Sequence, residues 1–308
     1  MSTRAATRTH PPRLLPAPPR VAAVPWRDYV ALTKPRIMSL LLLTAAAGMF
    51  AGARGVPDLG KLAALLAGGA LASGGASALN HLLDRDVDAL LGERTADRPV
   101  VAGRIAPRQA LAFGLALSAL ALALLASAVN VLAALLAAAG TLGYVLVYTR
   151  WLKRSTPQNI VIGGAAGAMP PLVGWAAATG GLSAPALLLF GIVFLWTPPH
   201  FWALALLLRR EYAAAGIPML PVVRGERATA RWILRYTLVL GAVSVTPVLW
   251  LGAGLYLGAA VVLGACFIGL AVALRRAVTP DRAARLFHFS LLYLTLLFAA
   301  LAIDPLLS

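Results

Sequence analysis

The acidic side chains of this chain are concentrated in one short stretch. Five of its eleven Asp and Glu residues directly follow an apolar run: Asp84, Asp86, Asp88, Glu93 and Asp97. On a helix, residues four apart lie on one face, so Asn80, Asp84 and Asp88 form a stripe about 12 Å long, with Asp86 on the opposite face. Carboxylate and amide oxygens suit Mg²⁺, which also takes phosphate oxygens and water. The spacing predicts a catalytic magnesium site with Asp84, Asp88 and Asn80 as ligands. A solvated acidic loop would explain the charge but not the spacing.

Basic side chains accompany the acidic stripe. Arg94 and Arg98 follow it closely, and Lys153 and Arg154 belong to the next basic segment. Acid and base at one place fit a metal–diphosphate site, in which carboxylates hold Mg²⁺ and Arg or Lys binds the remaining phosphate oxygens. We therefore predict that these four residues bind substrate. The alternative for each arginine is the membrane topology rule, which alone places basic residues in such segments.

Further candidates lie later in the chain. Asn159 opens an apolar segment, and His200 lies inside another in Trp196-Thr197-Pro198-Pro199-His200-Phe201-Trp202. Ionisable groups at membrane depth are costly, and the two prolines interrupt the helix, which is tolerated where the backbone is buried or lines a cavity. We expect His200 to face an aromatic-walled cavity and to bind substrate, unless it only bonds a carbonyl that the prolines free.

The segment after this histidine contributes one more carboxylate. Glu211 is the only acidic residue between Asp97 and Glu226, and Tyr212 follows it. Glu211 could face Asp84 and Asp88 across the substrate site, or could form a surface pair with Arg209 or Arg210.

The composition sets the class of protein. Sixty per cent of the 308 residues are hydrophobic, 12% are charged, and the mean hydropathy is +0.82. Soluble domains carry about 25% charged residues, and a membrane-spanning helix needs about 20 apolar ones. We predict an all-α polytopic membrane protein with nine apolar segments. These run at 36–53, 62–82, 109–128, 130–148, 159–179, 184–207, 232–251, 254–274 and 286–304.

Charge supports this count and predicts an orientation. Of the 27 basic residues, all except Arg54 and Lys61 fall in the N-terminal region or in alternate loops. The positive-inside rule then places the N-terminus in the cytoplasm and the C-terminus outside. The net charge of +16 reflects this topology and attraction to anionic lipid, so we expect no nucleic-acid partner. The single cysteine, Cys266, excludes an intramolecular disulfide.

The N-terminal region differs from the rest. Residues 1–25 are rich in Pro and Arg and contain no acid, which predicts a disordered cytoplasmic tail before a membrane domain at 26–308. A mitochondrial transit peptide shares the bias, but the prolines oppose the amphipathic helix that it would form.

These motifs resemble the UbiA-type intramembrane prenyltransferases, and within them the heme-farnesylating branch. The resemblance covers about Lys34 to Pro221. It rests on six stretches: Leu32–Arg36, Asn80–Pro99, Tyr148–Asn159, Gly163–Pro171, Thr197–Ala205 and Glu211–Pro221. It implies nine helices around a central cavity open to the cytoplasmic side, in a bacterial cell inner membrane.

The same resemblance implies a reaction. Farnesyl diphosphate would bind with Mg²⁺, and its farnesyl group would pass to a vinyl group of heme B to give heme O. Heme A synthase and oxidase assembly factors become candidate partners. The chain departs from the family at the second motif, usually Asp-xxx-Asp, where it offers only Glu211. That leaves the number of Mg²⁺ ions open.

Two alternatives remain. A small-molecule transporter would expose polar groups along a path to both faces, whereas the outer half carries only Arg54, Asp58, Lys61 and Asp304. A prenyltransferase acting on an aromatic quinone precursor would need a cation for the acceptor carboxylate, and the sixth apolar segment has no Arg or Lys before Arg209.

Overall fold

A computed structural model describes residues 25–251 and 254–307, without the side chains of Glu93, Arg94 and Leu251. The expected tail therefore lies outside the described residues, apart from Pro25. Throughout the described part the regular structure is helical, as predicted.

Nine helices of the described chain are long and apolar enough to cross a membrane, which confirms the predicted number. They are α2 (Pro35–Ala53), α3 (Leu59–Leu83), α6 (Pro107–Ala128), α7 with η1 and α8 (Val131–Ser155), α9 with α10 (Asn159–Thr179), α11 (Ala184–Leu207), α14 with α15 (Glu226–Trp250), α16 (Leu255–Arg276) and α17 (Pro280–Leu307). Shorter helices are α1 (Trp26–Thr33), α4 (Arg85–Leu90), α5 (Glu93–Ala96), α12 (Arg209–Ala214) and α13 (Leu220–Val223).

Three of the predicted segments are too short. The fourth span continues to Ser155, the seventh begins at Glu226, and the ninth begins at Pro280. Each added portion is rich in Arg or Lys, so hydropathy alone excludes it. These side chains can extend their charged ends into water while their stems cover apolar surface, so a helix continues past the apolar run.

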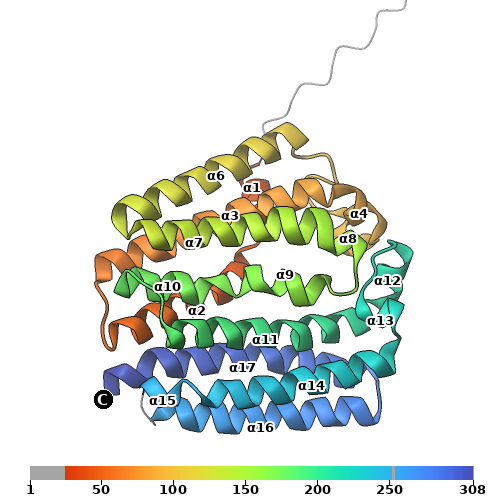
Figure 1. The fold of residues 1–308 in the computed structure, drawn as a ribbon. Helices are drawn as coiled ribbons and strands as arrows, with labels where there is room; N and C mark the ends of the chain where they lie inside the picture. The colour runs from red at the N-terminus through yellow and green to blue at the C-terminus, as the bar shows by residue number, and fades with distance from the viewer. Residues whose placement is uncertain (1–24, 252–253, 308) are drawn as a thin grey trace, which may run out of the picture.

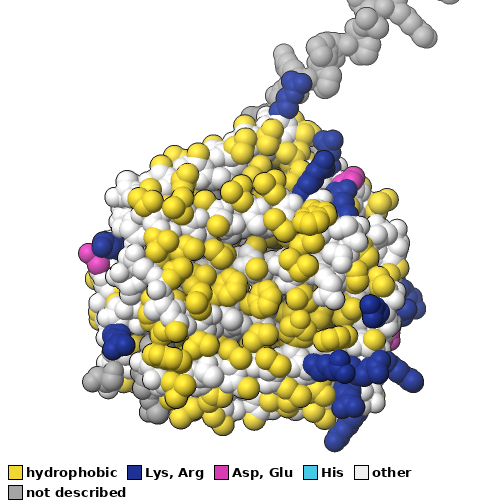
Figure 2. Space-filling view, viewed as in Figure 1, with side chains coloured by type: hydrophobic (Ala, Val, Ile, Leu, Met, Phe, Trp, Pro, Cys, Tyr) yellow, Lys and Arg dark blue, Asp and Glu magenta, His cyan; other side chains and the backbone are white. Residues whose placement is uncertain are grey.

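The long helices run side by side, and several short helices lie together at one end (Figure 1). That end carries α4, α8, α12 and α13, and we call it the α4 end; the C-terminus lies at the opposite end. Figure 2 shows apolar side chains over the middle of the molecule and basic side chains toward its ends. The chemistry-bearing segments thus gather at one edge of an apolar belt.

Helices α2 and α10 approach each other through glycine. A Cβ added at Gly174 would stand 1.8 Å from the carbonyl oxygen of Ala45, and one at Gly48 would stand 2.4 Å from that of Pro171. Both contacts are with backbone, which cannot rotate away. Close backbone contact through small residues is the usual way in which membrane helices pack.

We expect Gly174→Ala to destabilise the protein by about 3 kcal/mol, because the methyl group must separate the two helices. Thermal unfolding in detergent measures this. Gly191→Ala in α11 is the matched control, since a Cβ there meets nothing within 4 Å. It should be neutral or slightly stabilising, because alanine favours helix. Equal melting temperatures for the two variants would contradict the close approach.

Candidate active site

The acidic stripe spans the junction of two helices. Helix α3 ends at Leu83, Asp84 follows, and α4 begins at Arg85. The four-residue register survives the junction, because the Asp84 amide donates to Asn80 O at 2.9 Å and the Asp88 amide to Asp84 O at 2.7 Å. Asn80, Asp84 and Asp88 are buried at 4%, 1% and 1% exposure. The Asp86 side chain is 61% exposed, so it lies off the buried stripe.

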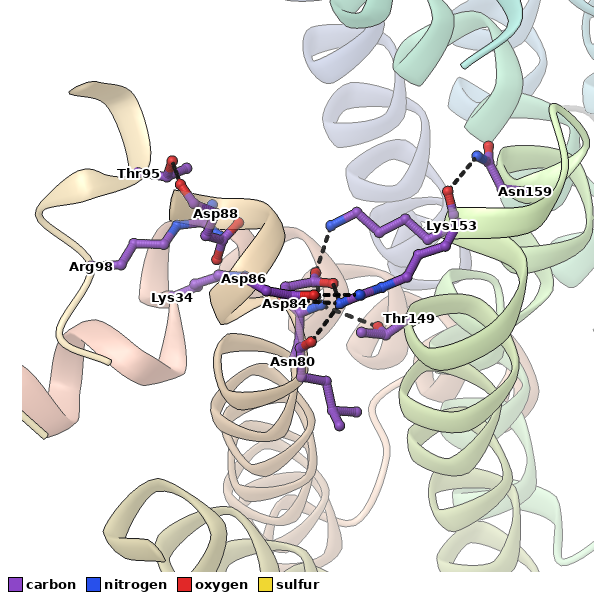
Figure 3. A network of polar contacts seen from close by, with 12 residues as sticks. Lys34, Asn80, Asp84, Asp86, Asp88, Thr95, Arg98, Thr149, Lys153 and Asn159 are labelled. Atoms are coloured by element: carbon purple, nitrogen blue, oxygen red, sulfur yellow. Dashed lines mark hydrogen bonds and ion pairs between the residues drawn. The ribbon is translucent and has the colours of Figure 1, made fainter. Parts of the chain in front are cut away.

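Asp84 lies at the centre of a polar network (Figure 3). Its Oδ2 accepts from Lys153 Nζ at 2.5 Å and from Asn80 Nδ2 at 2.7 Å. Arg154 comes within 3.9 Å of Oδ1, too far for a hydrogen bond. The preceding turn of α3 and the distant α8 therefore place an amide and an ammonium on one buried carboxylate.

Asn80 connects two residues that we did not predict as site residues, Lys34 and Thr149. Its Oδ1 accepts from Lys34 Nζ at 2.9 Å, and its Nδ2 also donates to Thr149 Oγ1 at 3.1 Å. The Asn80 oxygen thus already has a cationic partner. Burial lowers the pKa of Lys34 to about 7, with Arg98 adding to the effect.

Lys34 occupies an unusual backbone position. It joins α1 to α2 at φ 50° and ψ 61°, in the left-handed region, directly before Pro35. Such strain in a non-glycine residue persists only where the surroundings impose it, and it clusters at functional sites. Both residues lie in stretches that carry the family resemblance, Lys34 in Leu32–Arg36 and Thr149 in Tyr148–Asn159, but neither was singled out as a site residue.

Asp88 has its own partners. Arg98 donates to its Oδ2, and the Thr95 hydroxyl donates to its backbone carbonyl. Burial raises the pKa of the Asp88 carboxyl, and the nearby Arg98 only partly offsets this. The segment after α4 therefore folds back so that Arg98 covers the second carboxylate of the stripe.

Arg154 pairs mainly with Asp86. Its two terminal nitrogens donate to Asp86 at 2.6 and 2.7 Å, and one also donates to Leu83 O at 2.7 Å. The bidentate contact lowers the pKa of the exposed Asp86 carboxyl to about 2. This pair fastens α8 to α4 beside the buried stripe.

A π-helix presents the residues opposite the stripe. The segment η1 (Gly143–Leu152) carries Thr149, and Lys153 follows it. π-Helix is rare in proteins, and where it occurs it is often part of a functional site. Asn159, fully buried, donates through Nδ2 to Lys153 O at 3.4 Å and so supports the turn that holds Lys153. A Cβ at Gly163 would stand 2.4 Å from Tyr148, so this glycine lets α9 pack against η1.

Several buried polar atoms of this region have no hydrogen-bond partner in the described chain. They include Asp84 Oδ1, Asp88 Oδ1 and Asn159 Oδ1. Unpartnered buried carboxylate oxygens are costly unless a ligand satisfies them. No group of three or more His, Cys, Asp or Glu residues forms a metal cluster in the described part. Two carboxylates without a full protein cage suit Mg²⁺, which takes its other ligands from phosphate and water. The residues present therefore fit the ion.

Among the other predicted residues, Glu211 lies outside this network. Glu211 is exposed on α12, and no ion pair joins it to Arg209, to Arg210 or to the stripe within the described residues. Arg209 instead pairs with Glu226 at 2.9 Å. Tyr212 packs, half-buried, against the main apolar core. The Arg94 side chain lies outside the described part.

His200 lies in a closed aromatic stack instead of the wide cavity that we expected. Its ring stacks on Trp196 at 4.4 Å and on Phe287 at 4.8 Å between centroids, and it is 7% exposed. Its Nδ1 lies 2.7 Å from Ser290 Oγ. Since that hydroxyl donates to Phe287 O at 2.6 Å, its oxygen accepts from His200 Nδ1–H. The assigned tautomer leaves the Nε2 lone pair free.

Comparisons with known proteins show the family of the chain. Residues 41–298 match the UbiA prenyltransferase family. A protoheme IX farnesyltransferase of Symbiobacterium thermophilum is 55% identical over 90% of this chain and 94% of its own length. Protoheme IX farnesyltransferase 1 of Pseudomonas fluorescens is 50% identical over 99% of this chain and 98% of its own length. The chain covers only 52% of a longer Roseiflexus relative of the same name.

The fold also has solved counterparts. A UbiA homolog from Archaeoglobus fulgidus, solved with DMAPP and Mg²⁺, superposes with a TM-score of 0.63 over 90% of this chain and 99% of its own, at 20% identity. At that identity the likeness concerns the fold. The chain is an integral membrane protein that belongs to the UbiA prenyltransferase family and, within it, groups with the protoheme IX farnesyltransferases.

Proposed function

We propose that this protein transfers the farnesyl group of farnesyl diphosphate to a vinyl group of heme B, giving heme O. The observation that carries this is the buried pair Asp84 and Asp88, each with one carboxylate oxygen unpartnered in the described chain and each beside a cation. The names of relatives 50–55% identical over nine-tenths or more of the chain supply the acceptor.

Asp84 and Asp88 would hold Mg²⁺, which when bound neutralises the diphosphate. Lys153 and Arg98 each contribute a cation to the stripe, and Lys34 contributes a third in its protonated form. As the allylic C–O bond breaks, its electron pair leaves on the diphosphate, and fixed cations stabilise that developing charge. The burial of the stripe keeps water away, which strengthens each of these interactions. The vinyl π electrons would then form the new C–C bond to the farnesyl carbon. Water would add to the cation left on the vinyl carbon beside the ring and lose a proton, which gives the hydroxyl group of heme O.

We propose that His200 binds the iron of heme B through Nε2. Iron-binding histidines usually donate their other N–H to an oxygen, as His200 does to Ser290. The stack of Trp196 and Phe287 fixes the plane of the imidazole ring. A quinone precursor would need no such ligand.

His200→Ala should weaken heme binding at least tenfold and shift the heme absorption spectrum, with farnesyl diphosphate affinity nearly unchanged. Heme titration of the purified protein measures the first two quantities. Ser290→Ala, which removes only the orienting bond, should give a smaller loss. Full heme O synthesis with an unchanged spectrum in His200→Ala would make His200 structural.

We propose that the α4 end faces the cytoplasm of a bacterial cell, within its inner membrane. The alternation of basic residues supports this orientation. A cysteine placed at Ala96, after Cys266→Ser, should react with an impermeant thiol reagent only from the cytoplasmic side. Labelling from the outer side of intact cells would reverse the topology.

The assay for the function uses membranes that contain the protein, heme B, farnesyl diphosphate and Mg²⁺, with mass analysis of the extracted hemes. A new heme heavier by a farnesyl group and a hydroxyl group is expected, and chelation of Mg²⁺ should abolish it. The same membranes with an aromatic quinone precursor should give no prenylated product. The reverse result would move the protein to the quinone branch of the family.

A further inference from the structure

A charged hollow lies away from the acidic stripe, between α14 and α16. Its volume is about 210 Å³, and its lining residues are Arg231, Leu234, Arg235, Leu238 and Arg275. Figure 2 shows dense basic side chains at the α4 end, where α14 begins and α16 ends (Figure 1). We call this hollow the α14–α16 groove.

The charges of the groove are not compensated by the protein. Three guanidinium groups line it, and no carboxylate does. In the described chain no ion pair involves Arg231, Arg235 or Arg275, whereas Arg98, Arg104, Arg154 and Arg209 each pair with a carboxylate. Arg235 instead lies over the Trp232 ring, 4.8 Å from its centroid. Like charges around one hollow repel, and an anion bound among them removes that repulsion.

The remaining wall is apolar and faces outward. Leu234 is nearly buried at 8% exposure, while Leu238 is 48% exposed and its neighbour Val239 is 50% exposed. These residues belong to a membrane-spanning helix. By helix rise, Leu238 lies about 10 Å beyond Arg231 along α14. The groove therefore passes from guanidinium groups to lipid-facing leucine at the edge of the apolar belt.

We propose that the α14–α16 groove binds an anionic phospholipid, with its phosphate among Arg231, Arg235 and Arg275 and an acyl chain along Leu234 and Leu238. Guanidinium groups match phosphate oxygens in bidentate geometry, and basic pockets between membrane helices bind anionic headgroups in this way. A soluble phosphate or diphosphate shares the headgroup chemistry but leaves the leucine wall unused, so the lipid is the better fit. The inference does not depend on the proposed function.

Native mass spectrometry of the purified full chain in neutral detergent tests the proposal, with phosphatidylglycerol as the probe and phosphatidylcholine as the neutral comparison. One phosphatidylglycerol should remain bound per chain. Arg275→Gln alone should weaken its binding about fivefold, and the triple variant Arg231→Gln, Arg235→Gln and Arg275→Gln about 100-fold. Leu238→Ser should weaken the binding of phosphatidylglycerol but leave the binding of inorganic diphosphate unchanged.

The matched charge control is Arg108→Gln, Arg224→Gln and Arg276→Gln, three exposed arginines outside the groove. It changes net charge equally and should alter lipid binding less than threefold; Leu296→Ser on α17 is the apolar control. Equal losses in the two triple variants, equal retention of phosphatidylcholine, or displacement of the lipid by equimolar inorganic diphosphate would each overturn the proposal. If the groove triple variant fails to fold, Arg275→Gln and Leu238→Ser decide the question.

Discussion

Asp84→Asn and Asp88→Asn should each lower turnover by about a thousandfold, equivalent to about 4 kcal/mol of transition-state stabilisation. Each substitution replaces a buried carboxylate by a neutral amide that offers Mg²⁺ no charge against the diphosphate. Asp84→Asn also leaves Lys153 without its anionic partner. Single-turnover transfer of the farnesyl group, measured with saturating Mg²⁺, reports the chemical step.

Asp86→Asn is the control for this prediction. Asp86 lies between the two stripe residues in sequence, but its side chain is 61% exposed and pairs with Arg154. Its loss should cost less than about fivefold, since an exposed ion pair contributes about 1 kcal/mol or less. The Mg²⁺ concentration for half-maximal turnover should rise in the stripe variants and not in this control. Equal losses at all three positions would remove the stripe as the ligand set.

The helices could be predicted because their signal is local. The number of membrane spans follows from the runs of apolar residues and from the alternation of basic loops. Nine helices long and apolar enough to span a membrane lie in the described chain. The predicted helix ends were wrong where arginine-rich turns extend a helix beyond its apolar run, as in α14, which begins at Glu226. Hydropathy scores an arginine as charged, but it does not take into account that the long side chain can place its charged end in water while the helix continues.

The stripe could be predicted for the same reason. Asn80, Asp84 and Asp88 are four residues apart, and the amide bonds that keep this register continue through the break at Asp84. Their partners come from elsewhere: Lys34 is 46 residues from Asn80, and Lys153 is 69 residues from Asp84. Periodicity carries no information about which distant segments meet, so Lys34 and Thr149 were missed.

For His200, too, the local motif was visible in the sequence, but the contacts made by a distant helix were not. The prolines and aromatic residues before it are visible in sequence, and they indicated a specialised environment. The closed stack depends on Phe287 and Ser290 of α17, which only the packing of α17 against α11 brings to the ring. A local motif therefore could not distinguish a wide cavity from a closed one.

Lys153→Met should lower both stability and turnover, for different physical reasons. The Lys153 side chain is 11% exposed and its Nζ lies 2.5 Å from the nearly buried Asp84 carboxylate. Removing it leaves a buried charge with weak compensation, which costs about 3 kcal/mol of unfolding free energy. Turnover should fall by at least a hundredfold, because a fixed cation beside the diphosphate is lost.

Combining Lys153→Met with Asp84→Asn separates these two effects. With both charges removed, no uncompensated ion remains, and the Asn80 side-chain amide can still donate to an oxygen at position 84. The double variant should therefore recover most of the stability lost in Lys153→Met, yet stay inactive, because the metal ligand is gone. Thermal unfolding in detergent and farnesyl transfer are measured on the same preparations. Additive losses of stability would mean that Lys153 and Asp84 do not interact, while recovered activity in the double variant would show that the pair is structural and that catalysis depends on other residues.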